Sequence, residues 1–113
     1  MIVAGKTKGE QNMYIVSILY ADQSPTTLHE FIKKPTFKEL YPLIQCDTIE
    51  IQRGLENDQI VELYCDEESK LKNNSLENKV ATNMWYNWQD KTGHMCIPGD
   101  FIAGNVAIIE KVL

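Results

Sequence analysis

The second half of the chain limits the possible folds most, because short apolar segments there alternate with turn residues in a fixed order. Residues 49–51 and 60–65 alternate apolar with polar side chains, as half-buried β-strands do. Residues 76–88 repeat apolar side chains at helical spacing, and residues 106–112 form a last apolar segment. This order predicts an α+β domain with a mainly antiparallel sheet and one or two short helices.

Turn residues occupy the connections between these segments. Residues 54–58 (Gly-Leu-Glu-Asn-Asp) predict a hairpin loop between the first two strands. Residues 66–68 form an acidic turn after the second strand, and Asn73 and Asn74 mark another turn. Glycine and polar residues at 98–105 come before the last strand. Each predicted element is therefore bounded by residues that favour turns.

The first half predicts two further strands and a third segment that is either a strand or a short helix. Residues 13–20 are apolar nearly throughout, which predicts a central strand, and residues 2–4 can pair with it as a first hairpin. Residues 22–25 (Asp-Gln-Ser-Pro) have turn chemistry. Residues 28–32 fit either a strand or a short helix.

A short helix is predicted after Pro35. Thr36 and Glu39 have the spacing of a capping box, in which each side chain bonds the other residue's backbone N–H. Pro42 lies within the helical pattern and is expected to distort it, because proline lacks the N–H that the helix uses. The residues that share one face of this helix are Phe37, Leu40, Tyr41 and Ile44.

Length and charge restrict the class of protein. The chain has 113 residues, enough for one domain with its own core and too few for two, so we expect a single domain over residues 1–113. The formal net charge is -5, with lysines interspersed among the acids. This pattern makes direct DNA binding unlikely on electrostatic grounds and lacks the dense carboxylate surface of a DNA mimic.

Cysteine usage indicates a reducing compartment. Cys46, Cys65 and Cys96 are an odd number at wide spacing, which implies no disulfide framework. Residues 1–5 lack a basic region followed by a long apolar stretch, and the apolar runs are far shorter than the about 20 residues of a membrane span. We therefore expect a cytoplasmic protein with no membrane association.

Several of these segments resemble those of a known family. They are Ile49-Glu50-Ile51, Asp66-Glu67-Glu68, Asn78-Lys79-Val80-Ala81-Thr82 and Gly99 to Gly104. Over residues 36–109 the chain resembles the family catalogued as domain of unknown function 3846, small proteins of phages, plasmids and their bacterial hosts. It departs from that pattern at Cys46-Asp47, where relatives carry glycine, and in a longer segment at residues 83–96. The resemblance implies a bacterial host cell and no assigned activity.

The aromatic segment at residues 85–88 is the predicted ligand-binding site. Aromatic rings can stack on a nucleobase, and neighbouring amides and lysines can hold its edges or phosphates. The alternative is that Trp88 and Met84 face the core while Tyr86 covers the surface. The predicted ligand-binding residues are Trp85, Tyr86, Trp88, Asn83, Lys79 and Lys91, with Asn87 beside them.

No metal or cofactor is expected. Glu62 with the acidic turn at 66–68 offers carboxylates for a hard cation, but the spacing lacks the pattern of an EF-hand, and a solvated acidic turn is the favoured interpretation. His94 and Cys96, with Cys65 or Cys46, lack the short-spaced ligand pairs of zinc sites.

A catalytic set is possible only around His94. Cys96 is a candidate nucleophile beside it, and Asp100 a candidate orienting acid. The simpler alternative is that Asp100 forms a turn and bonds backbone N–H groups. Gly5-Lys6-Thr7 lacks the upstream glycine of a phosphate-binding loop.

Three functions follow as hypotheses. The preferred one is a non-catalytic accessory protein of a phage or mobile element that binds a host factor and counteracts a host defence or regulatory system. The alternatives are a small-molecule sponge for a nucleotide signal, using the aromatic segment, and a weak hydrolase using His94, Cys96 and Asp100. Homo-oligomers are also expected to form through edge strands near either terminus.

Overall fold

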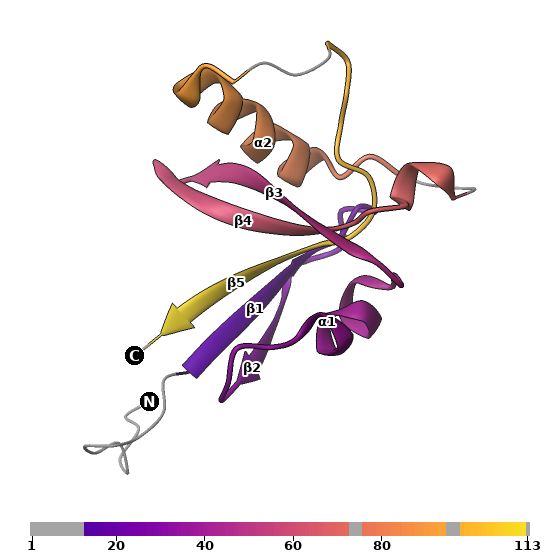
Figure 1. The fold of residues 1–113 in the computed structure, drawn as a ribbon, viewed down its shortest axis with the longest axis vertical. Coiled ribbons are helices and arrows are strands. Elements are labelled where there is room, and N and C mark those ends of the chain that lie inside the picture. Colours follow the sequence, from indigo (N-terminus) through magenta and orange to yellow (C-terminus); the bar gives the residue numbers. More distant parts are fainter. Residues whose placement is uncertain (1–12, 73–75, 95–97, 113) are drawn as a thin grey trace.

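The computed structural model describes residues 13–72, 76–94 and 98–112. Five strands form one antiparallel sheet in the order β2-β1-β5-β4-β3, and two α-helices pack on it (Figure 1). This confirms the predicted α+β class. The elements are β1 (Met13–Leu19), β2 (Thr27–Phe31), α1 (Phe37–Ile44), β3 (Ile49–Glu56), β4 (Gln59–Asp66), a short 3₁₀ helix (Ser69–Leu71), α2 (Lys79–Thr92) and β5 (Val106–Val112).

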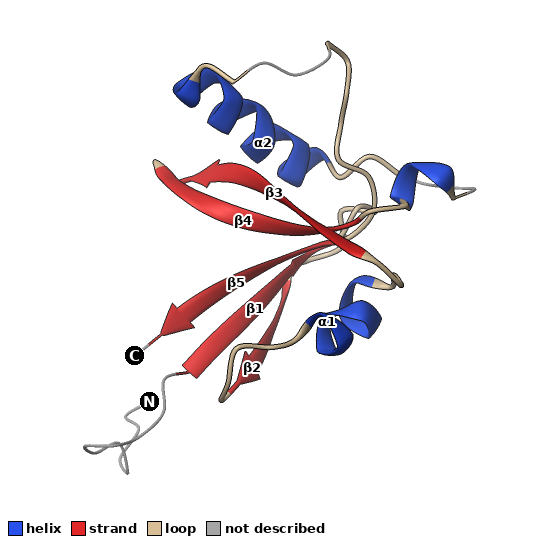
Figure 2. Ribbon diagram, in the orientation of Figure 1, coloured by secondary structure: helices blue, strands red, loops and turns tan. Residues whose placement is uncertain are grey.

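The last strand, β5, occupies the middle of the sheet. It pairs with β1 from Met13–Val112 to Leu19–Val106, whereas it pairs with β4 only at Tyr64–Ala107 and Cys65–Val106. The β3–β4 hairpin therefore diverges from the other three strands (Figure 2). β1 is an interior strand as predicted, although β5 is the central one. The expectation of an edge strand at the C-terminal end is wrong, since the edges are β2 and β3.

The two helices cover opposite faces of the sheet, each over its own hydrophobic cluster (Figure 1). Neighbouring residues of a strand point to opposite faces, so Tyr64 and Ala107 join the α1 cluster while Cys65 and Val106 join the α2 cluster. The α1 cluster comprises Val16, Ile18, Leu40, Ile44, Cys46, Tyr64 and Ala107. The α2 cluster comprises Leu63, Cys65, Ala81, Met84, Ile102, Val106 and Ile108.

The predicted capping box begins α1. Glu39 N donates to Thr36 Oγ1 at 3.2 Å, and Thr36 N donates to Glu39 Oε1 at 3.0 Å. The helix continues past Pro42 for two residues and ends at Ile44, where Gln45 takes a left-handed conformation with φ 59°. Leu40 and Ile44 are buried as predicted, whereas Phe37 is 42% exposed and contacts the edge of the Tyr64 ring.

The predicted loop at residues 54–58 is too long. β3 continues through Glu56, and the turn consists of Asn57 and Asp58, whose φ angles are 51° and 64°. Two positive φ angles are typical of the two-residue turns that match the twist of a hairpin. Gly54 lies within β3 because α2 packs there: a Cβ atom at Gly54 would lie 2.9 Å from Leu63 Cδ1 and 3.1 Å from Met84 Cβ.

The predicted strand at residues 60–65 is confirmed, with Leu63 and Cys65 buried on the α2 face. Residues 27–31 form a strand, which resolves the ambiguity at 28–32. The helix at 76–88 begins later, at Lys79, and Val80 is 54% exposed, so only Met84 of the predicted apolar face is buried. The predicted hairpin partner at residues 2–4 and the turn at Asn73–Asn74 lie outside the described residues.

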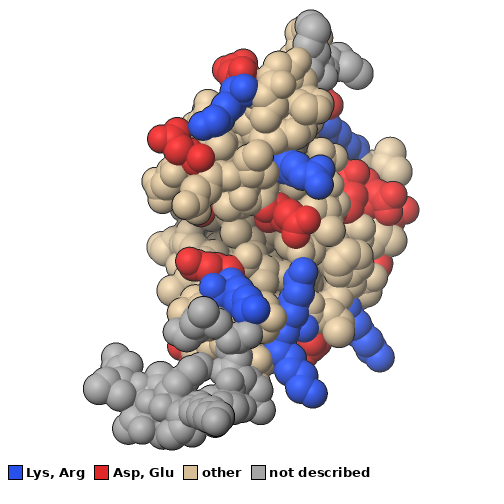
Figure 3. Space-filling view, turned by 60° about the vertical axis from the view of Figure 1, so that its left-hand side comes forward, with Lys and Arg blue, Asp and Glu red and all other residues tan. Residues whose placement is uncertain are grey.

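Charge is distributed as the sequence indicates. On the face seen in Figure 3, lysine and arginine side chains are interspersed with aspartate and glutamate. Among the described residues, no helix is long and apolar enough to cross a membrane.

Asn78 joins three elements through its buried side chain, which is 1% exposed. Its Nδ2 donates to the backbone oxygens of Leu19 at 2.9 Å and Gly104 at 3.0 Å. Its Oδ1 accepts from Ala81 N at 3.1 Å and so caps α2. One amide therefore links the end of β1, the segment before β5 and the first turn of α2.

We expect Asn78→Ala to lower the free energy of unfolding by about 3 kcal/mol, because it removes a cap and leaves two buried carbonyls without a donor. Asn78→Asp keeps the acceptor for Ala81 N but loses both donors, so it is also expected to destabilise. Urea unfolding followed by circular dichroism measures both. Asn83→Ala, at an exposed position of α2, is the control, and a loss no larger than the control's would contradict the prediction.

Candidate functional site

A cleft of about 770 Å³ lies at one end of the sheet. Its walls come from the β1–β2 turn, the end of α1, the segment after β4 and the residues before β5. Most of the lining residues have polar side chains, and Ile44, Pro25 and Leu76 supply apolar surface. Ligand sites in proteins commonly have about 300–1,000 Å³, so this cleft has the size of a small-molecule site.

The β1–β2 turn is held by its own polar residues, as the sequence predicts. Ser24 N donates to Asp22 Oδ1 at 2.9 Å, and Gln23 N donates to Tyr20 O at 3.1 Å. Ala21 N donates to Asn105 Oδ1 at 3.0 Å, which ties the turn to the segment before β5. These bonds hold the wall of the cleft in place.

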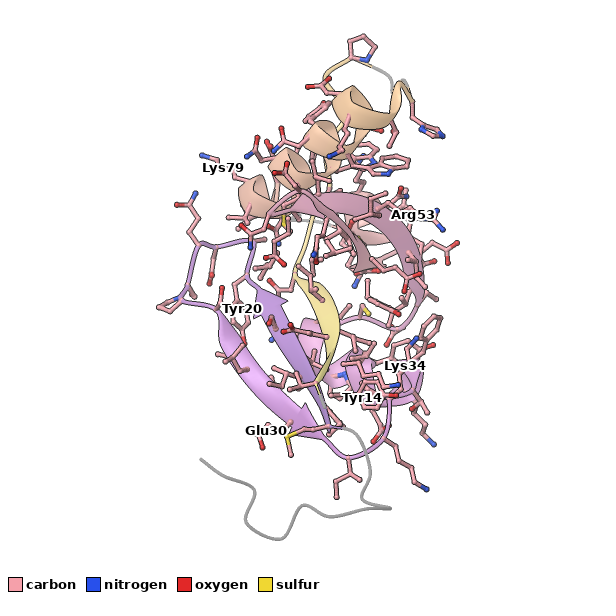
Figure 4. The ribbon with its side chains drawn as sticks, turned by 90° about the vertical axis from the view of Figure 1, so that its left-hand side faces the viewer. Tyr14, Tyr20, Glu30, Lys34, Arg53 and Lys79 are labelled. Carbon is pink, nitrogen blue, oxygen red and sulfur yellow. The ribbon has the colours of Figure 1, made fainter. Side chains whose placement is uncertain are left out.

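Tyr20, at the end of β1, lines the cleft (Figure 4). Its hydroxyl lies 2.9 Å from Thr27 Oγ1, and Thr27 Oγ1 lies 3.2 Å from His29 Nε2. This chain of polar contacts crosses from β1 to β2 and orients the tyrosine ring. The ring is only partly buried, which leaves aromatic surface at the cleft.

Asp66 also lines the cleft, and it corrects the expectation of a solvated acidic turn for this one residue, since Glu67 and Glu68 are exposed as expected. The residue is 5% exposed, and its carboxylate accepts from Glu68 N at 2.9 Å and from Lys72 Nζ. The hydrogen bond to Asp66 raises the pKa of Lys72. A buried carboxylate needs such partners, because an unpaired buried charge is costly.

The predicted aromatic residues are spread around α2. Successive helix residues are rotated by about 100°, so Tyr86 and Trp88 point to nearly opposite sides. Trp85 packs on the α2 cluster, the Tyr86 hydroxyl donates to the backbone oxygen of Asp100, and Trp88 stacks on His94 at 4.7 Å. The polar members, Lys79, Asn83, Asn87 and Lys91, are exposed. Ligand binding by these residues stays a prediction, without a shared cavity to support it.

A smaller cavity of about 140 Å³ is lined by Trp85, Glu50, Lys70 and Asp100, among others. Burial, with the nearby charge of Glu67, raises the pKa of Glu50. Lys70 forms an ion pair with Asp100 and also lies 4.8 Å from the centre of the Phe101 ring. The positive charge of Lys70 in this cavity is therefore paired with Asp100.

Two residues of the predicted hydrolase, His94 and Asp100, are engaged in structural contacts. Asp100 Oδ1 accepts from Phe101 N at 2.8 Å, which confirms the turn interpretation, and its bond from Lys70 lowers the pKa of Asp100. His94 Nδ1 lies 2.8 Å from Thr92 Oγ1. Cys96 lies outside the described residues. Within the described ranges, no group of three His, Cys, Asp or Glu residues could hold a metal ion.

Comparison with known proteins adds no relative. No family model, curated protein or solved structure matches the chain. The resemblance to domain of unknown function 3846 therefore stays a prediction.

The sequence analysis missed the cleft, because its residues come from distant segments. Gln45 enters it as the left-handed residue after α1, and Asn105 follows Gly104, whose φ is 84°. The only sequence signals were the turn residues at 22–25 and 104–105, which indicated turns and not a shared wall.

We expect Cys46 and Cys65 to resist alkylation in the folded protein. Burial raises the pKa of Cys46 to about 11 and that of Cys65 to about 12, so at pH 8 the thiolate fraction of Cys46 is on the order of one in a thousand. Iodoacetamide labelling read by peptide mass spectrometry should modify both residues only in denaturant. Rapid labelling of either residue in the folded protein would contradict this burial.

The same thiols affect stability at high pH. Each thiol has a higher pKa in the folded state than in the unfolded state. Its contribution to the free energy of unfolding is therefore complete below the unfolded pKa and is lost as pH rises through the folded pKa. The contribution of Cys46 to the free energy of unfolding should therefore decrease between pH 9.0 and about 11.

Proposed function

We propose that this protein is a non-catalytic binding protein that holds a small polar molecule in the cleft. The observation that carries the proposal is the cleft itself: about 770 Å³, lined by hydroxyl, amide and carboxylate side chains together with the apolar Pro25, Ile44 and Leu76. Such a combination is typical of sites where polar groups orient a ligand and apolar contacts supply affinity. The proposal keeps the sponge hypothesis and moves its site from the aromatic segment to the cleft.

Two features favour binding over catalysis at this site. Among the described residues, the cleft lining contains hydroxyls but no cysteine and no histidine, the residues that most often serve as activated nucleophile and base. Its buried acid, Asp66, is occupied by Lys72 and by Glu68 N. In the setting that the family resemblance implies, the cytoplasm of a bacterial host, such a protein would sequester a small molecule.

A second candidate is binding to a host protein, through the face of the β3–β4 hairpin opposite α2. Ile51 and Ile60 are 41% and 56% exposed there. Arg53 lies between them, opposite Glu62 in the strand register, and makes no ion pair among the described residues. This surface suits a partner segment with apolar side chains and a carboxylate to pair with Arg53.

The cleft is tested by Thr27→Trp. Thr27 lines the cleft, and an indole there should fill part of it. We expect native mass spectrometry of the wild-type protein purified from its host to show a small adduct that is released on denaturation, and the Thr27→Trp protein to lack it.

Leu28→Trp is the matched control, because the next residue along β2 points to the other face of the sheet. It should retain the adduct, and circular dichroism checks that both variants fold. An adduct that persists equally in Thr27→Trp would place the ligand elsewhere, and a wild-type protein without any adduct would argue against the proposal.

The second candidate is tested by Ile60→Glu, which puts a charge on the exposed hairpin face. A host protein that co-purifies with the wild type should be lost from this variant, because the carboxylate would be desolvated at the interface. Leu28→Glu, at a residue that is 66% exposed on another surface, should retain the partner. Loss from both variants, or from neither, would contradict binding at this face.

A further inference from the structure

The charges that line the cleft restrict the kind of molecule that it can hold. Asp22 and Asp66 are its acids, and Lys72 is the single basic side chain among the described lining residues. Lys72 already pairs with Asp66. Hydrogen bonds from Ser24 lower the pKa of Asp22, which keeps its exposed carboxylate ionised at neutral pH. Among the described lining residues, a phosphate group in the cleft would therefore meet an exposed carboxylate and no unpaired cation.

The uncharged lining residues can bind the edges of a heterocycle. Gln45 and Asn105 are side-chain amides, each with donors and an acceptor. Asn105 Nδ2 lies 3.4 Å from Gln45 Oε1, at the long limit of a hydrogen bond, so a ligand edge can replace this contact at little cost. The hydrogen bond from Ala21 N to Asn105 Oδ1 would still hold the asparagine side chain in place when a ligand replaces this contact.

One aromatic ring and several apolar side chains also line the cleft. The Tyr20 hydroxyl is held by Thr27, which fixes the ring that lines the cleft. Pro25, Ile44 and Leu76 add apolar surface. An aromatic ring stacks on planar heterocycles and also attracts cations to its face.

We propose that the cleft binds a flat, uncharged or cationic heterocycle with hydrogen-bonding edges, the class that includes nucleobases and nucleosides, in preference to the phosphorylated form. This inference rests on the binding function proposed above and narrows its ligand class. It also departs from the sponge for a nucleotide, whose phosphates the exposed lysines of α2 were expected to hold.

The full-length protein labelled with ¹⁵N should be titrated with adenosine, guanosine, cytidine and uridine and with their 5′-monophosphates, and followed by NMR. We expect at least one nucleoside to shift the amide signals of residues 20–27 and 104–105. Its dissociation constant should be on the order of tenfold lower than that of its monophosphate, because two extra negative charges approach Asp22.

Two variants test whether Asp22 sets this preference. Asp22→Asn keeps an oxygen that can accept from Ser24 N and removes only the charge, so the ratio of the two dissociation constants should fall toward one. Glu30→Gln is the matched control: it removes the same charge from β2, farther from the turn than Tyr20 is (Figure 4), and should leave the ratio unchanged.

The outcomes separate this inference from the proposed function. A monophosphate that binds as tightly as its nucleoside, with shifts at the same residues, overturns the inference and leaves binding in the cleft intact. Equal changes in both variants also overturn it, since overall charge would then set the preference. If no nucleoside shifts any signal, the ligand class is wrong, and the co-purified adduct decides separately whether the cleft binds another molecule.

Discussion

The structure depends on one buried amide, the side chain of Asn78. It bonds the backbone oxygens of Leu19 and Gly104 and caps α2 through Ala81 N. Residue Thr82, one turn later, exchanges hydrogen bonds with the backbone of Ile102 through its hydroxyl. Without these bonds the carbonyls at the divergence of the sheet would be buried without donors, a cost that apolar packing cannot offset.

The divergence of the sheet follows from the short pairing between β4 and β5. They pair at only two positions, so the β3–β4 hairpin and the β2-β1-β5 part twist apart, and each needs its own helix to cover one face. Because the helices lie on opposite faces, each part of the sheet keeps one face that its helix leaves open. The exposed hairpin face with Ile51 and Ile60 is one result of this arrangement.

The cleft is a second result, since it forms where the loops of both parts meet. It brings together a turn stabilised by Asp22, the left-handed residue Gln45 and the ion pair between buried Asp66 and exposed Lys72. None of these features depends on a ligand to form: each residue has a structural partner or a conformation set by its own element. A site preorganised in this way loses little conformational entropy when a ligand binds.

The sequence by itself determined the local features: the capping box at Thr36 and Glu39, the turn at 22–25, and the strands whose apolar residues alternate. These depend on contacts within a few residues, which spacing and residue type express directly. The role of Gly54 was mistaken, because a glycine between two strands suggests a turn until the helix that packs on it is known.

Only the tertiary structure decided which strand is central, which helix faces are buried and where the cleft lies. β5 pairs with β1 and β4 across long stretches of chain, and Ala21 N meets Asn105 Oδ1 across 84 residues. Periodicity also left α2 undecided, since the aromatic residues from 85 to 88 fit both a packing face and a binding face. Contacts between distant segments are set by the packing of the whole sheet, which no local pattern in the sequence records.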